Sequence, residues 1–156
     1  MNEDLKNLLI TIISGVGVYV FSQWYTEFIL QPIKEYKRLK AKVAKLLILH
    51  AQYYCNPWVY GAEGDCEVWK RASQEMRELA AEVAAFAEIK PTQILVLGAI
   101  PRKKDLLEAQ SHLIGLSNSF FTSKMGMDNC IDRVILYSEE IKRNMGITHK
   151  KKSEKS

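Results

Sequence analysis

The first third of the chain changes from an uncharged apolar segment to a basic amphipathic one. Residues 7–26 read NLLITIISGVGVYVFSQWYT and contain no formal charge. As a helix, that length suits a hydrocarbon core of roughly 30 Å. Apolar residues then recur at helical spacing over 33–54, with lysines largely on the other face. The pattern predicts a transmembrane helix over 7–30 that continues as an amphipathic helix and stops before Pro57.

Three later segments show the same helical spacing of apolar residues and predict an all-α fold. They cover about 66–88, 103–121 and 128–145. The apolar run TQILVLGAI at 92–100 predicts a short buried helix, although a strand also fits it. The residues expected in the core of the last helix are Ile131, Val134, Ile135, Ile141 and Met145, and Gly146 is expected to end that helix.

The length of 156 residues leaves room for one modest core and excludes a second enzyme-sized domain. We expect a short external N-terminus over 1–6, the transmembrane helix over 7–30 and a cytoplasmic helical domain over 31–146. The last segment, 147–156, is basic and polar, and its composition predicts a disordered tail.

The distribution of charge around the apolar segment predicts its orientation. Six basic residues lie within 34–45, whereas the residues before the segment offer Lys6 beside two acidic residues. Positive charge marks the cytoplasmic side of a membrane, so we expect the N-terminus outside and the C-terminus in the cytoplasm, at a bacterial inner membrane. No signal-peptidase-like site follows, so the segment is expected to stay attached. The expected interfacial anchors are Trp24, Tyr25, Lys34, Lys37 and Arg38.

Small and polar residues make the apolar segment less hydrophobic than a typical span. Residues of this kind favour helix–helix contacts or a water-filled pore over lipid, although lipid also tolerates glycine. The segment therefore predicts a homo-oligomer. The residues expected to face a neighbouring copy are Thr11, Ser14, Gly15, Gly17, Ser22 and Gln23.

Composition narrows the chemistry further. The formal net charge is +4, and the basic residues after the span and in the tail suit anionic lipid headgroups or nucleic acid. The three cysteines lack a CxxC pair and predict reduced thiols, with no zinc site. Glu108 and His112 could share a helical face as metal ligands, but a hydrogen-bonded pair is commoner. There is no P-loop, GxSxG or HExxH motif, and we expect neither metal nor cofactor.

One pattern near the C-terminus has a catalytic interpretation. Arg143 and Asn144 are followed by His149, an R-N-x4-H arrangement like that of HEPN-type helical nucleases. A histidine can move protons for an attacking 2′-hydroxyl, and an arginine can stabilise charge on phosphate. The spacing arises easily by chance, and Arg143 equally suits the C-terminal end of a helix. We therefore expect a non-enzymatic protein, with RNase activity as an alternative.

The segments LQPIKEYKRLKAKVAKLLILHAQYYCNP and LIGLSNSFF resemble those of a widespread group of uncharacterised bacterial single-span proteins. This resemblance covers most of the chain after the anchor and implies no particular activity. In size, layout and the Arg143–His149 pattern, the chain is also similar to the small membrane accessory proteins of RNA-targeting, type VI CRISPR systems. That similarity implies a ring-like inner-membrane oligomer that acts as an antiviral pore, with a HEPN-like motif that need not cleave RNA.

These observations give a ranked functional expectation. The first is a CRISPR-associated antiviral membrane effector that forms a pore-like homo-oligomer. The second is a membrane-tethered helical module that recruits a cytoplasmic protein or RNA partner, and the third is a HEPN-like RNase. Anionic lipid headgroups are the expected partner in each case.

Overall fold

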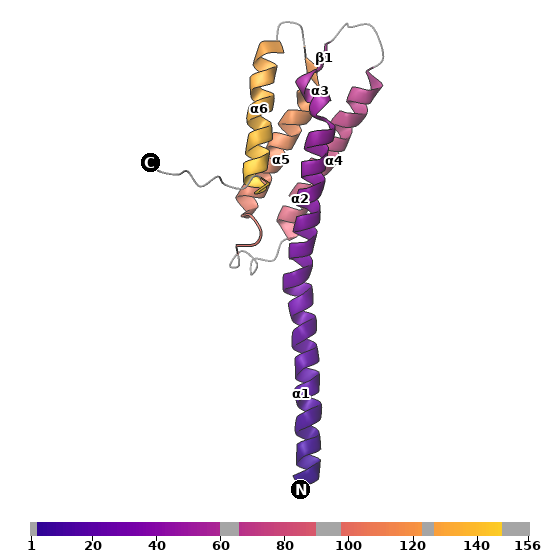
Figure 1. Cartoon of the computed structure of the whole chain (residues 1–156), viewed down its shortest axis with the longest axis vertical. Coiled ribbons are helices and arrows are strands. Elements are labelled where there is room, and N and C mark those ends of the chain that lie inside the picture. Colours follow the sequence, from indigo (N-terminus) through magenta and orange to yellow (C-terminus); the bar gives the residue numbers. More distant parts are fainter. Residues whose placement is uncertain (1–2, 60–65, 90–97, 123–126, 148–156) are drawn as a thin grey trace, which may run out of the picture.

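A computed structural model describes residues 3–59, 66–89, 98–122 and 127–147, and shows an all-α chain with one very long N-terminal helix (Figure 1). The elements are α1 (Glu3–Tyr25), the π-helical turn η1 (Thr26–Leu30), α2 (Gln31–Leu49), α3 (Ala51–Cys55), β1 (Trp58–Val59), α4 (Glu67–Ile89), α5 (Lys103–Asn118), β2 (Phe121–Thr122) and α6 (Met127–Asn144).

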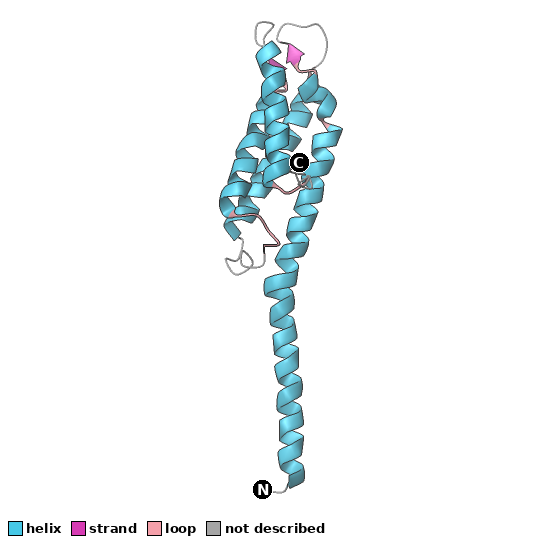
Figure 2. Ribbon diagram, turned by 60° about the vertical axis from the view of Figure 1, so that its left-hand side comes forward, coloured by secondary structure: helices cyan, strands magenta, loops and turns pink. Residues whose placement is uncertain are grey.

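The elements α1, η1 and α2 form one continuous rod (Figure 2). Pro32 lies within this rod, yet the helix continues through it. Proline has no N–H, and its ring crowds the carbonyl four residues earlier. The π-turn just before it widens the helix, with the Gln31 N–H donating to the Thr26 carbonyl. The rod therefore passes the proline without breaking.

The amphipathic helix was predicted to continue unbroken until just before Pro57, but it is interrupted at His50. The helix α2 ends at Leu49, and the short helix α3 ends at Cys55, so helical structure stops before Pro57 as predicted. Asn56 has φ −128° and ψ 73°, which is not a helical conformation. Trp58 then pairs with Phe121 in a two-residue parallel bridge between β1 and β2. The prediction had placed Phe121 inside a helix, but the α5 helix ends at Asn118 and the chain turns to make this bridge.

The helices α2, α4, α5 and α6 form a bundle in which successive helices run in opposite directions (Figure 1). The closest packing is between α4 and α5 and between α5 and α6, while α2 packs on α4 and α3 on α6. The end of α6 lies beside α2, where the Tyr36 hydroxyl donates to the Met145 carbonyl over 2.7 Å. The helix α1 leaves the bundle at the end where α4 stops and α5 starts (Figures 1 and 2).

The core consists of one stripe from each helix of the bundle. From α4, Met76, Leu79 and Val83 are fully buried, and Phe120 fills the end near β1. In α6, Val134, Ile141 and Met145 are buried as predicted, and Cys130 joins them.

Two residues of α6 were wrongly assigned to the core. Ile131 is 44% exposed and Ile135 is 52% exposed, since both lie to the side of the stripe that contains Val134 and Ile141. Helical spacing cannot tell which part of a broad apolar face touches the core. Ile131 and Ile135 therefore belong to the surface of α6 and not to the core.

Gly146 ends α6 as predicted, with a left-handed backbone at φ +56° that glycine adopts without strain. The predicted short helix over 92–100 and the predicted tail over 147–156 lie almost entirely outside the described residues.

Candidate functional site

The most unusual feature of the structure is an apolar helix that nothing covers. No residue of α1 or η1 is buried. Ile13 and Val18 are 68% and 71% exposed. The rod Glu3–Leu49 is the one described helix long and apolar enough to cross a membrane. A bare apolar surface of this size is stable only against lipid or other protein.

The predicted contact residues of α1 fall into two groups. At 100° per residue, Thr11, Ser14, Gly15 and Ser22 share one face of the helix, whereas Gly17 and Gln23 lie off that face. Nothing lies within 4 Å of where a side chain would start at either glycine. We call Thr11, Ser14, Gly15 and Ser22 the small-residue face.

Several polar side chains of α1 are hydrogen-bonded within the helix. The Thr11 hydroxyl donates to the Asn7 carbonyl and the Ser14 hydroxyl to the Ile10 carbonyl, each over 2.9 Å. The Gln23 amide donates to Glu27 Oε1 over 2.7 Å. Internal hydrogen bonds of this kind lower the cost of placing Ser and Thr in lipid. These residues therefore do not by themselves require a water-filled pore.

Aromatic and basic side chains follow one another at the lower end of the bundle. The rings of Phe21, Trp24 and Phe28 pack in a row, with centroids 6.1 and 5.9 Å apart. The predicted basic anchors, Lys34, Lys37 and Arg38, are all exposed one to three turns further on. Aromatic rings followed by cations match the two layers of a membrane interface.

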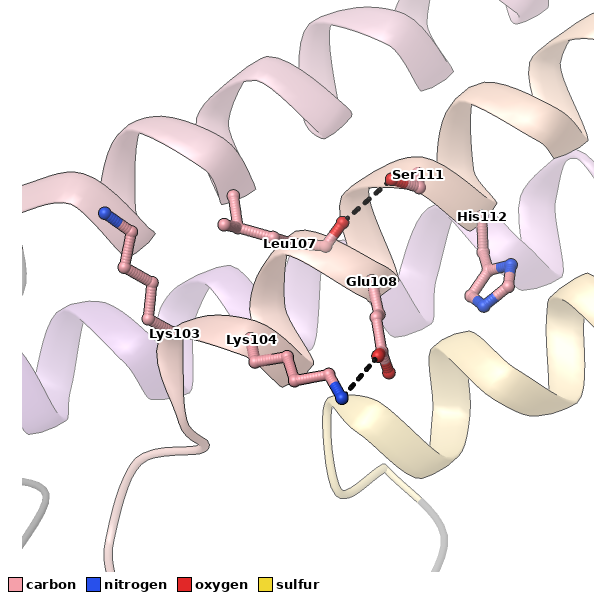
Figure 3. Close-up of a pocket in the computed structure, with 6 residues that line it drawn as sticks. All are labelled: Lys103, Lys104, Leu107, Glu108, Ser111 and His112. Carbon is pink, nitrogen blue, oxygen red and sulfur yellow. Dashed lines mark hydrogen bonds and ion pairs between the residues drawn. The ribbon is translucent and has the colours of Figure 1, made fainter.

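A shallow hollow on α5 contains the candidate metal pair, and Figure 3 shows its lining residues. Glu108 forms an ion pair with Lys104 at 3.7 Å and accepts a hydrogen bond from Asn144 at 3.5 Å. The His112 ring packs on Tyr137, with centroids 5.4 Å apart. Among the described residues no group of three His, Cys, Asp or Glu side chains could hold a metal ion. The hollow's lining residues are Lys103, Lys104, Leu107, Glu108, Ser111 and His112.

The candidate nuclease residues are not assembled in the described part of the chain. Arg143 is largely exposed and forms an ion pair with Glu140 one turn earlier. Asn144 turns toward Glu108 on α5. His149 lies outside the described residues. Arg143 thus occupies the place expected of a cation in the last turn of a helix.

The LIGLSNSFF segment joins α5 to α4 through a polar seam that the sequence did not reveal. Ser73 of α4 donates to the Ser117 carbonyl over 3.1 Å, and Arg77 donates to the Ser117 hydroxyl over 3.3 Å and to Asn118 Oδ1 over 2.9 Å. Ser117 is fully buried. Buried polar groups are stable only when hydrogen-bonded, and the bonds that satisfy Ser73 and Ser117 also join α4 to α5.

A buried histidine is a second feature that was missed. His50 lies at the junction of α2 and α3, and its Nε2 is 2.9 Å from Glu75 Oε2 on α4. Its Nδ1 has no hydrogen-bond partner among the described residues. The spacing of Val43, Leu47 and His50 along one helical face could have indicated that the ring points inward.

Comparison with known proteins adds no further evidence: no family model, curated protein or solved structure matches this chain.

Proposed function

We propose that this chain is a single-span inner-membrane protein whose copies assemble side by side in the membrane. The observation that carries the proposal is the uncovered apolar helix α1. Each large apolar side chain of α1 moved from water into lipid contributes about 1.5–3 kcal/mol. The sum over α1 strongly favours insertion.

The charges around the rod support a cytoplasmic bundle. Lys34, Lys37 and Arg38 are exposed where α2 joins the bundle, so all three can reach anionic headgroups of the inner leaflet. At the other end, Glu3 and Asp4 accompany the one cation Lys6. The proposed N-terminus is therefore outside.

Self-assembly is supported by the small-residue face, which lets another helix approach closely in lipid. The pore-like antiviral effector is the finer form of this proposal, and it rests on the resemblance to membrane accessory proteins of type VI CRISPR systems. In that form, expression or activation collapses the membrane potential.

The two glycines of α1 provide a matched test. Gly15 lies on the small-residue face and Gly17 lies off it, and both are fully open in the structure. A Gly15→Ile substitution should weaken assembly about tenfold, a loss of about 1.4 kcal/mol, because the added side chain keeps a neighbouring helix from approaching closely. A Gly17→Ile substitution adds the same bulk and should leave assembly unchanged.

The measurement is the mass of the protein in lipid nanodiscs or by native mass spectrometry, together with a potential-sensitive dye in expressing cells. We expect several copies per particle. A single copy with an unchanged membrane potential would contradict both self-assembly and the pore.

A second candidate function is a membrane-tethered module that recruits a cytoplasmic partner. The exposed apolar residues of α6 favour it, because surface patches of this kind mark contact sites. In that case the protein is monomeric in nanodiscs, and a defined partner dissociates when Ile135 is replaced by Glu.

A further inference from the structure

The outward face of α6 combines apolar and acidic side chains. Ile135 and Leu136 are each 52% exposed. On the helix they flank Asp132 and Glu139, which lie opposite the buried stripe. Neither acid forms an ion pair within the described residues. We call these four residues the acidic face.

The outward face of α2 has the opposite charge and the same layout. Ile48 is 79% exposed and Leu49 is 54% exposed. They flank Lys45 on the side opposite the buried residues of α2. Lys45 is exposed and, in the part of the chain that the structure describes, has no acidic partner. We call Lys45, Ile48 and Leu49 the basic face.

The two faces lie at about the same height along the bundle. Tyr36 of α2 contacts Met145 at the end of α6, and the two helices run in opposite directions (Figure 1). Both helices rise about 1.5 Å per residue. Lys45 is nine residues beyond Tyr36, and Leu136 is nine residues before Met145. Lys45 and Leu136 are therefore level, and the contact between α3, which follows α2, and α6 agrees with this register.

From these observations we infer that the acidic face of α6 docks on the basic face of α2 of a neighbouring copy. This inference rests on the proposed membrane insertion, because copies held by the same span in one bilayer stand upright at equal height. Equal height brings Lys45 of one copy between Asp132 and Glu139 of the next. The apolar pairs on the two helices then bury each other.

The charges exclude the two symmetric alternatives. Pairing two acidic faces would place Asp132 and Glu139 against their own copies, and pairing two basic faces would place lysine against lysine. Closer to the membrane, the same sides of the two helices carry Arg143 and Arg38, which are both basic, so the attraction is confined to the half of the helices farther from the bilayer.

Docking between two different faces has a structural consequence. In a docked pair, one copy keeps its basic face free and the other keeps its acidic face free, so a further copy can add on either side. Since every copy shares the membrane normal, such growth stays in the plane of the bilayer and closes as a ring when the rotation between copies permits it.

The test is cross-linking between two single-cysteine variants in the native membrane. Cys55 and Cys66 are first replaced by serine, because Cys55 is exposed and Cys66 partly so. Ile48→Cys and Ile135→Cys are then introduced into separate, differently tagged copies, and a short bismaleimide is added. Both positions are exposed, so neither variant removes a core contact.

We expect cross-linked dimers when the two variants are co-expressed and none when either is expressed alone. Adding Lys45→Glu to the Ile48→Cys copy should abolish the cross-link, and adding Glu139→Lys and Asp132→Lys to the Ile135→Cys copy should restore it. Cross-linking of Ile135→Cys with itself would overturn the inference in favour of a symmetric contact.

The outcome is separable from that of the proposed function. If the protein has the mass of several copies but the mixed variants do not cross-link, the docking faces are wrong and assembly itself stands. If the protein is a monomer and the mixed variants do not cross-link, both proposals fail.

Discussion

At the scale of single residues, polar contacts between helices fix how the bundle is assembled. Tyr36 is buried, and the hydrogen bond from its hydroxyl joins α2 to the end of α6. The polar seam does the same between α4 and α5. The apolar partners of these groups could be predicted from periodicity. The polar contacts could not, because a serine in a helix looks the same in a sequence whether it faces solvent or another helix.

Replacing Tyr36 with Phe should lower the free energy of unfolding by about 1 kcal/mol, because the Met145 carbonyl loses its buried donor. Thermal unfolding in detergent measures the effect. Tyr19→Phe is the matched control, since Tyr19 is 69% exposed and is not buried against another helix of the described chain. Equal stability of the two variants would show that the hydroxyl contributes nothing.

The same residue predicts a dependence on pH. Burial raises the pKa of Tyr36 above its ordinary value, and burial together with Cys55 raises the pKa of Tyr54. Because the pKa of each tyrosine is higher in the folded state, its burial as the neutral phenol stabilises the fold. This contribution is complete below about pH 10 and is lost as the pH rises beyond it. The melting temperature should fall above pH 10, and less steeply for Tyr36→Phe than for the unmodified chain.

At the scale of elements, the helices and their ends were largely predictable. The predicted helix over 66–88 is Glu67–Ile89 in the structure, and the predicted helix over 128–145 is Met127–Asn144. The π-turn before Pro32 was not predictable. Whether a proline bends, breaks or widens a helix depends on the packing on either side of it, which the local sequence does not specify.

The division between the uncovered helix (α1 with η1) and the bundle predicts that these two parts are separable. Every buried residue in the described ranges lies at Pro32 or later. A chain that begins at Gln31 should therefore stay in solution, keep its helical circular dichroism and unfold cooperatively. Aggregation or loss of helical signal would show that α1 and η1 take part in folding the bundle.

At the scale of the whole molecule, the apolar surface falls into two kinds. The helix α1 exposes apolar side chains on every side and carries no charge after Lys6, whereas α6 and α2 present narrow apolar strips edged by charge. Sequence periodicity assigned Ile131 and Ile135 to the core, since a contact surface shows the same spacing as an internal face. Only the packing of the helices separates the two.

The central claim is that α1 crosses the membrane and leaves the bundle in the cytoplasm. The most direct measurement uses a membrane-impermeant maleimide on intact cells, in a chain that carries Cys66→Ser. Cys130 is buried, so exposed Cys55 is the natural reporter for the bundle. An added Glu3→Cys, in a second chain that also carries Cys55→Ser, reports the N-terminus.

We predict that the cysteine at position 3 is labelled in intact cells and that Cys55 is labelled only after the membrane is permeabilised. Labelling of Cys55 from outside, or protection of both positions until permeabilisation, would contradict the account.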